Sequence, residues 1–293
     1  LDNPRYRSVR ILLPALAHGL GLGRPAWILN AYALSNLLFY ALLLFAFVRL
    51  LKPRTVGQFL CLAAAMWSTG VLASVERALT DLPAAALAFF AAGMTSAGAL
   101  PVFAAAVLCR EAAIVSLFSV VWPRAFHTKE LLRLGLGAAA VVLPLAAWML
   151  YVGSVFRDCG TTTPESLGQP FAGLAGYLRT AAAALLSDPN RLTFFNLLSV
   201  LSLLVQVAYL LARPAVRSPF WRMGIGVAVL FFFFGPPLFS EQLAYCRAAL
   251  PVTLAFNALL MDREENRFWS WFVAGNAGLT WGALRMAWLM IKP

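Results

Sequence analysis

The 293-residue chain is strongly apolar, with 61% hydrophobic residues, 12% charged residues and a mean hydropathy of +0.79. A soluble domain carries about a quarter of its residues as charged side chains, so this composition excludes an ordinary soluble enzyme. It predicts an all-α, polytopic bundle of transmembrane helices that forms a single domain over residues 1–293. The net charge of +11 accompanies no basic tail and no basic-aromatic alternation, and we therefore expect no nucleic-acid partner.

The N-terminal segment, residues 1–25, is predicted to form an outer loop and an interfacial helix. Arg5, Arg7 and Arg10 precede an apolar stretch that is too short, and too often interrupted by glycine and proline, to cross a membrane. Amphipathic helices of this kind lie at the membrane surface. Their arginines also suit a phosphate head group.

Seven apolar runs are long enough, or nearly so, for a helical crossing, which needs about 20 residues. They are residues 26–51, 57–74, 134–156, 193–212, 219–237, 242–261 and 268–291. The region 82–123 is interrupted at 93–98 and by the pair Arg110-Glu111. We expect three short crossings there, at about 82–96, 99–110 and 111–123. The bundle then has about nine or ten crossings or half-crossings, plus interfacial helices.

The charge of the loops predicts the two sides of the membrane. Four short loops are basic, around residues 52–54, 124–133, 213–222 and 263–267, and short cytoplasmic loops carry an excess of Lys and Arg. Three crossings within 82–123 bring all four loops to that side. The opposite side then receives the loop and helix region 157–190 and a mixture of acids and arginines. Crossings shorter than a bilayer are tolerated where they line a cavity, so the pattern predicts a polar pocket on the extracytoplasmic side.

Two charged clusters adjoin apolar runs, and each has an alternative interpretation. Glu76, Arg77 and Asp81 could be a solvated loop followed by the first turn of a helix, with Pro83 in that turn. Arg110-Glu111 has a weaker structural explanation, because an ion pair within an apolar region adds little stability. Ionisable residues at membrane depth are instead typical of functional sites.

No metal or cofactor site is evident in the sequence. The four cysteines and two histidines lack the spacing of metal ligands, and no Asp-X-Asp pair occurs. We therefore predict no resident cofactor, and the sequence leaves assistance by a divalent cation open.

Five segments, taken in order, resemble a known family: "DNPRYRSVRILLPALA", "SVERALTDLPAAAL", "LCREAAIV", "GQPFAGL" and "YCRAALPVTLAFNALL". Together they are similar to bacterial integral membrane glycosyltransferases of the C superfamily, and the likeness runs from Asp2 to about Leu260. The resemblance implies a bacterial cytoplasmic (inner) membrane, an extracytoplasmic cavity and a polyprenyl-phosphate sugar as the donor. It also implies an N-terminal helix upstream of the position of Leu1.

The resemblance and the chemistry of inverting transfer together assign candidate roles. A carboxylate should deprotonate the acceptor hydroxyl, and Asp2 is the first candidate for this base, with Asp81 the second. Arginine forks match phosphate oxygens. The candidates for phosphate binding are Arg7, Arg10, Arg110 and Arg247. The candidates for orienting these arginines are Glu76 and Glu111.

Two other functions stay open at this point. A non-catalytic structural or assembly subunit that retains the glycosyltransferase-like fold would pack against partner membrane subunits. A transporter would show internal symmetry and polar residues at the membrane midplane, neither of which the sequence displays. The enzyme interpretation implies instead a lipid-linked sugar donor and membrane lipids as partners.

Overall fold

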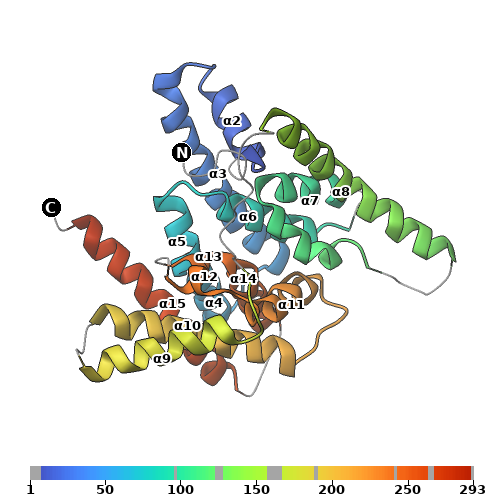
Figure 1. Ribbon diagram of the computed structural model, residues 1–293. Coiled ribbons are helices and arrows are strands. Elements are labelled where there is room, and N and C mark those ends of the chain that lie inside the picture. The colour runs from blue at the N-terminus through green and yellow to red at the C-terminus, as the bar shows by residue number, and fades with distance from the viewer. Residues whose placement is uncertain are drawn as a thin grey trace.

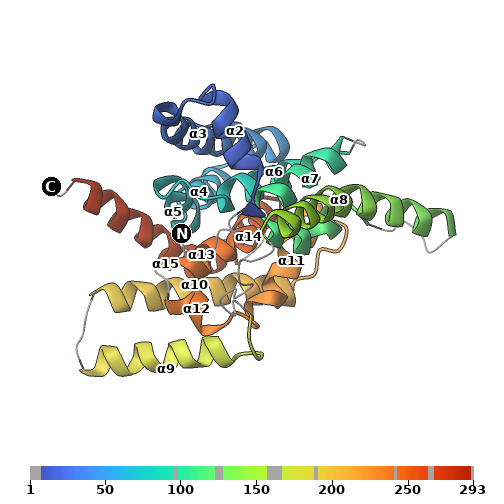
Figure 2. The same ribbon diagram turned by 45° about the horizontal axis from the view of Figure 1, so that its top comes forward.

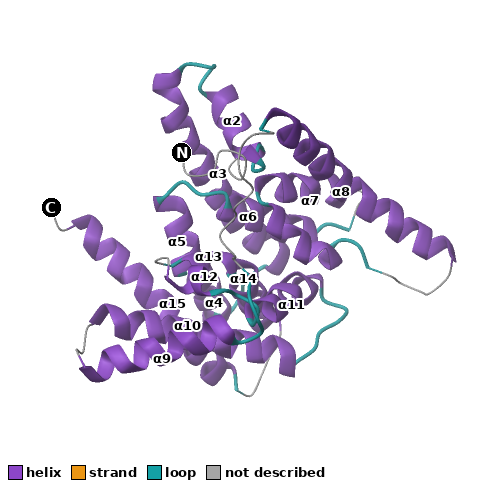
Figure 3. Cartoon of the chain, viewed as in Figure 1, coloured by secondary structure: helices purple, strands orange, loops and turns teal. Residues whose placement is uncertain are grey.

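The computed structural model describes residues 8–95, 98–122, 128–156, 167–187, 191–240, 243–262 and 267–291. These residues are almost entirely helical (Figure 3). Within them, extended pairing is limited to a single bridge between Leu167 and Phe234. The predicted all-α class is therefore confirmed.

Three helices are long and apolar enough to cross a membrane: α3 (Pro25–Leu51), α8 (Thr128–Val155) and α10 (Arg191–Ala212). A fourth candidate is the bent pair α4 (Val56–Met66) and α5 (Thr69–Glu76), whose axes differ by 40°. Large apolar side chains on α3 and α8, such as Leu29 and Leu150, are exposed. Such surfaces are compatible with a multi-pass membrane protein, while the number of crossings stays a prediction.

The region 82–123 folds into three short helices, and the breaks fall close to where the sequence predicted them. They are α6 (Asp81–Ala92), α7 (Ala99–Cys109) and the 3₁₀ helix η1 (Glu111–Ser119). At 1.5 Å per residue, α6 and α7 are each about 17–18 Å long, well short of a hydrocarbon core of about 30 Å. Each is therefore shorter than a full span, and whether these helices cross the membrane stays a prediction.

The remaining helices are α2 (Leu12–Leu20), α9 (Ala172–Ser187), α11 (Pro219–Phe231), α12 (Pro236–Ser240), α13 (Ala244–Ala248), α14 (Leu250–Asp262) and α15 (Phe268–Ile291). Three predicted continuous runs, 57–74, 219–237 and 242–261, are wrong in this respect, because each contains a break. Proline explains the last two breaks: it disfavours helical backbone in the residue before it and suits the first turn of a helix. Pro236 opens α12 and Pro251 lies in the first turn of α14.

Helices α6 and α14 form the centre of the bundle. Nearly every residue of α14 is buried, and so are ten of the residues of α6. Around them lie α3, α4, α7 and α11, while α8 and α15 extend to opposite edges and α9 lies alongside α10 (Figures 1 and 2). A reciprocal amide pair joins α14 to α15, in which Asn257 and Asn276 each donate to the other over 3.1 Å.

Helix η1 is fixed in place by α11. The hydroxyl of Ser116 donates to the carbonyl of Met223 at 2.7 Å, and Arg222 donates to the carbonyl of Phe118 at 2.9 Å. A Cβ atom at Gly226 would lie 2.5 Å from the carbonyl oxygen of Val115. Only glycine allows this close approach, and it sets the depth at which η1 enters the bundle.

Two cavities lie at opposite ends of α11 and α14, and charged residues line both of them. A cavity of about 710 Å³ lies where α3 ends, where α11 begins and where α14 ends, and Arg217 and Asp262 line it. Two of the predicted basic loops, 52–54 and 213–222, adjoin this end, and most of the loop 263–267 lies outside the described residues. The other ends of α11 and α14 reach a second cavity, which holds the acids and arginines described next. Which end faces the cytoplasm stays a prediction.

Candidate functional site

A cavity of about 980 Å³ lies between α6, α11 and the junction of α7 with η1. This volume is at the upper end of the roughly 300–1,000 Å³ usual for small-molecule sites. Its polar lining consists of Arg10, Tyr32, Thr80, Asp81, Arg110, Glu111, Ser116 and Arg247. Segments from nearly the whole length of the chain therefore meet at one site.

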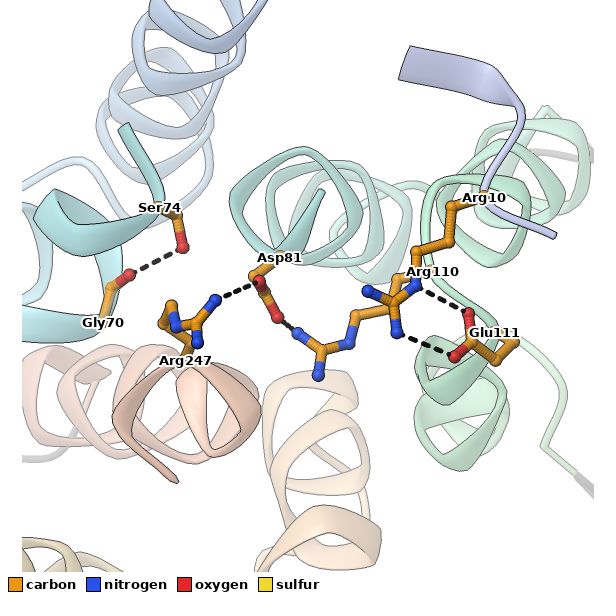
Figure 4. A network of polar contacts seen from close by, with 7 residues as sticks. All are labelled: Arg10, Gly70, Ser74, Asp81, Arg110, Glu111 and Arg247. Carbon is orange, nitrogen blue, oxygen red and sulfur yellow. Dashed lines mark hydrogen bonds and ion pairs between the residues drawn. The ribbon is translucent and has the colours of Figure 1, made fainter. Parts of the chain in front are cut away.

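Asp81 is at the centre of an ion cluster with two arginines (Figure 4). One carboxylate oxygen contacts Arg110, and the other lies 3.6 Å from Nη1 of Arg247. The Asp81 side chain is 4% exposed, against 19% for Arg110 and 12% for Arg247. The carboxylate is thus enclosed between two guanidinium groups that come from different segments of the chain, the junction of α7 with η1 and helix α13.

The backbone explains how Arg110 reaches Asp81. Arg110 stands between α7 and η1 with φ −154° and ψ 119°, an extended conformation that interrupts the helix. Successive residues of extended backbone point to opposite sides. Arg110 accordingly contacts Asp81, while Glu111 contacts Arg10. Because of this helix break, the adjacent residues Arg110 and Glu111 contact two different partners, Asp81 and Arg10.

A close approach between α5 and α13 positions Arg247. A Cβ atom at Gly70 would lie 2.5 Å from the carbonyl oxygen of Cys246, so no larger residue fits there without displacing backbone. Ser74, one turn further along α5, donates its hydroxyl to the Gly70 carbonyl at 2.8 Å (Figure 4). Because Arg247 directly follows Cys246, this contact fixes the backbone from which its side chain extends toward Asp81.

Arg10 and Glu111 form a second ion pair, which ties the N-terminal segment to η1. Arg10 donates through Nη2 to Oε1 at 3.1 Å and through Nε to Oε2 at 3.2 Å. This two-point geometry is the stronger form of the arginine-carboxylate pair. The side chains are 21% and 31% exposed, so this pair is more accessible than the Asp81 cluster.

The other walls of the cavity are apolar. Ala84, Ala85 and Ala88 of α6 form one wall, and Val227 and Leu230 of α11 lie on another. Small side chains on α6 leave open space beside the charged groups. The cavity thus presents cations and hydrocarbon to the same occupant, a combination that suits an amphiphilic anion.

The structure brings together five of the eight residues that the sequence singled out: Arg10, Asp81, Arg110, Glu111 and Arg247. Asp2 and Arg7 lie outside the described residues. Glu76 is exposed at the end of α5 and makes no ion pair with an arginine in the described part of the chain, so its orienting role stays a prediction.

Asp81 has different surroundings from the rest of its sequence cluster. Glu76 and Arg77 are exposed, as a solvated loop would require, but Asp81 is buried and contacts two arginines. Sequence reasoning also missed Tyr32, Thr80 and Ser116 in the lining. The alanines that follow Asp81 on α6 were the available signal, because small residues beside a charge leave room for a cavity.

Metal ligands do not gather in the described residues: no group of three or more His, Cys, Asp or Glu side chains occurs there that could hold an ion. An Asp-X-Glu triplet does occur at 262–264, although Glu264 lies outside the described residues. Asp262 is exposed and lines the cavity at the other end of α14. The positive charges in the described lining of the site come from Arg10, Arg110 and Arg247.

Comparison of the chain with models of protein families, with curated proteins and with solved structures found no match. The resemblance drawn from the five sequence segments stays a prediction, and the function must be argued from the cavity itself.

Proposed function

We propose that this chain is an integral membrane glycosyltransferase whose arginine-lined cavity holds the phosphate of a polyprenyl-phosphate sugar donor. The observation that carries the proposal is the convergence of three arginines on one cavity with apolar walls. Arginine matches phosphate oxygens in two-point contacts. A hydrocarbon chain would favour the apolar walls and the surrounding bilayer. The cavity faces the extracytoplasmic side in this proposal.

Each contact supports a distinct role in the reaction. The acceptor hydroxyl oxygen attacks C1 of the sugar as the bond from C1 to the phosphate oxygen breaks, and the polyprenyl phosphate leaves with the bonding electrons. Arg110, Arg247 and Arg10 would stabilise the negative charge on that leaving group. Asp81 and Glu111 would hold these arginines in position.

The base that accepts the hydroxyl proton is assigned to Asp2. Asp81 was the second candidate, but its two guanidinium contacts support a positioning role instead.

A two-stage experiment tests the proposal. In the first stage, the full chain in lipid nanodiscs is titrated with farnesyl phosphate, and the affinity of Arg110→Gln is compared with that of wild type. Arg133→Gln is the matched control, because Arg133 is 63% exposed and pairs with Glu130 on α8. In the second stage, the same samples receive a panel of polyprenyl-phosphate sugars, and release of the lipid phosphate is measured. Binding or turnover that Arg110→Gln leaves unchanged would overturn the proposal.

A non-catalytic subunit of a larger membrane complex is the second candidate. The large apolar side chains exposed on α3 and α8 favour it, since they could pack against partner helices as well as against lipid. The mass of the complex extracted with a mild detergent separates the two functions. A fixed stoichiometry with other subunits, without lipid-phosphate binding, would favour the subunit.

A further inference from the structure

The side-chain hydroxyl of Thr80 has no hydrogen-bond partner in the part of the chain that the structure describes, although the residue is only 6% exposed. Thr80 lines the same cavity as Asp81 and the arginines. A buried hydroxyl without a partner is unfavourable, and native structures rarely leave one unpaired. Because Thr80 lines a cavity, an occupant of that cavity can supply the missing partner.

Thr80 does not cap helix α6, although it stands at the N-cap position. A threonine there normally accepts a hydrogen bond from a backbone N–H of the first turn. Thr55 does so at α4, where its hydroxyl accepts from the N–H of Gln58 at 3.4 Å. Thr80 instead has helical backbone angles, φ −78° and ψ −7°, and its side chain makes no capping bond. Helix capping therefore does not account for the hydroxyl of Thr80.

Tyr32, on α3, provides a second hydroxyl at this cavity. The residue is partly buried, and its phenol hydroxyl makes no hydrogen bond to another described residue. Ser116 carries the third hydroxyl of the described lining and differs from these two, because it donates to the carbonyl of Met223. The described lining thus contains one hydroxyl that is bonded to protein and two that can bond to a ligand.

The hydroxyl of Thr80 lies beside the groups that we propose to bind phosphate. Thr80 directly precedes Asp81, so their Cα atoms are about 3.8 Å apart, and Asp81 contacts Arg110 and Arg247. In a lipid-phosphate sugar, the sugar is bonded to the phosphate and must occupy the space next to it. A sugar presents several hydroxyls that both donate and accept, as the hydroxyls of threonine and tyrosine do.

We infer that Thr80 and Tyr32 contact the sugar of the donor: their hydroxyls form hydrogen bonds with sugar hydroxyls, so that the cavity recognises the sugar as well as the lipid phosphate. This inference rests on the proposed function, since it assumes that the cavity holds a lipid-linked sugar. A site built to form hydrogen bonds discriminates against a ligand that lacks the matching group. Thr80 and Tyr32 are therefore specificity-determining residues.

The test compares probes of equal charge: farnesyl methyl phosphate, which has no sugar, and farnesyl phosphate esterified with glucose, mannose or galactose. Affinities are measured on the full chain in nanodiscs of a zwitterionic lipid. Wild type should bind at least one sugar probe more tightly than farnesyl methyl phosphate. Thr80→Val removes the hydroxyl and should reduce this preference about two- to ten-fold, the usual net effect of one neutral hydrogen bond. Tyr32→Phe should act in the same way.

Matched variants show whether the effect comes from the two hydroxyls. Thr80→Ser keeps a hydroxyl and should retain the preference for the sugar probe. Thr55→Val and Tyr151→Phe remove the same groups at positions outside the described cavity lining, and both should leave the preference at the wild-type value. The affinity for farnesyl methyl phosphate should stay unchanged throughout, which also shows that each variant is folded.

The outcomes separate the inference from the proposed function. If farnesyl methyl phosphate binds but wild type prefers none of the sugar probes, the sugar contact is refuted while the phosphate site stands. The same holds if the preference persists in whichever of Thr80→Val and Tyr32→Phe still binds farnesyl methyl phosphate. If no probe binds wild type, the proposed function fails and the inference fails with it. A preference that falls in Thr80→Val and Tyr32→Phe but not in their matched variants supports the inference.

Discussion

The ion cluster of Asp81 with Arg110 and Arg247 makes a quantitative prediction about stability. Asp81→Leu leaves two guanidiniums without their shared carboxylate. At the observed 3.6 Å between Arg247 and Asp81, and at an effective dielectric constant of about 20, the Coulomb attraction is about 4–5 kcal/mol before desolvation. Removing one partner of a buried pair costs about 3–5 kcal/mol. We expect the free energy of unfolding to fall by about that amount.

A double-mutant cycle shows whether this loss comes from the pair. Arg110→Met should cost less than Asp81→Leu, because Asp81 keeps its contact with Arg247. The double variant should recover part of the loss, with a coupling free energy of about 1–3 kcal/mol. The assay is reversible unfolding of the full chain in bicelles.

The pair of Glu130 and Arg133, also 3.6 Å apart, is the matched control, because the Arg133 side chain is 63% exposed. A pair with a solvent-exposed partner contributes at most about 1 kcal/mol, and Arg133→Gln should cost no more than that. If Asp81→Leu were equally mild and its loss simply added to that of Arg110→Met, the cluster would be neither buried nor coupled in the membrane, and the argument from burial would be refuted.

Three further predictions test the site and its support. Asp2→Asn and Arg110→Ala should each abolish sugar transfer while the protein stays folded in membranes, as judged by transfer assay and by gel filtration; normal activity in both would remove the catalytic assignment. Gly70→Ala should displace α13 and lower the free energy of unfolding by about 1–3 kcal/mol, with weaker farnesyl phosphate binding in the same preparation. Asn257→Leu should cost about 1–3 kcal/mol, because it strands the buried amide of Asn276, but it should leave binding unchanged since that amide pair lies outside the cavity.

Much of the helical framework was predictable from hydrophobic runs. The long helices α3, α8 and α10 coincide with apolar runs to within a few residues, apart from the N-terminal extension of α8. The short helices of region 82–123 followed from glycine, small polar residues and the pair Arg110-Glu111. The break between α4 and α5 was missed, and so were the breaks before Pro236 and Pro251, because the apolar character of the last two runs continues through both prolines.

The membership of the site was predictable in part, but its pairing was not. Charged residues in an apolar chain are few, so most of them could be identified as candidates. Which carboxylate contacts which arginine depends on contacts between distant segments, such as Arg10 with Glu111 and Gly70 with Cys246. Hydropathy and loop charge contain no information on such distances. The sequence therefore offered both Glu76 and Asp81 as site residues, and only the folded chain shows that Asp81 is buried in the cavity while Glu76 is exposed.

The energetics of the cluster indicate why a phosphate site explains it better than stability does. Five ionisable side chains meet at one cavity in a chain that has only 12% charged residues. Buried ion pairs return little net stability, and replacing a whole cluster by apolar residues is often neutral or stabilising. If these residues served only to stabilise the fold, leucine and methionine at the same positions would give a similar free energy of unfolding. The proposed anionic ligand would supply the missing benefit, because guanidinium groups match phosphate oxygens in two-point contacts.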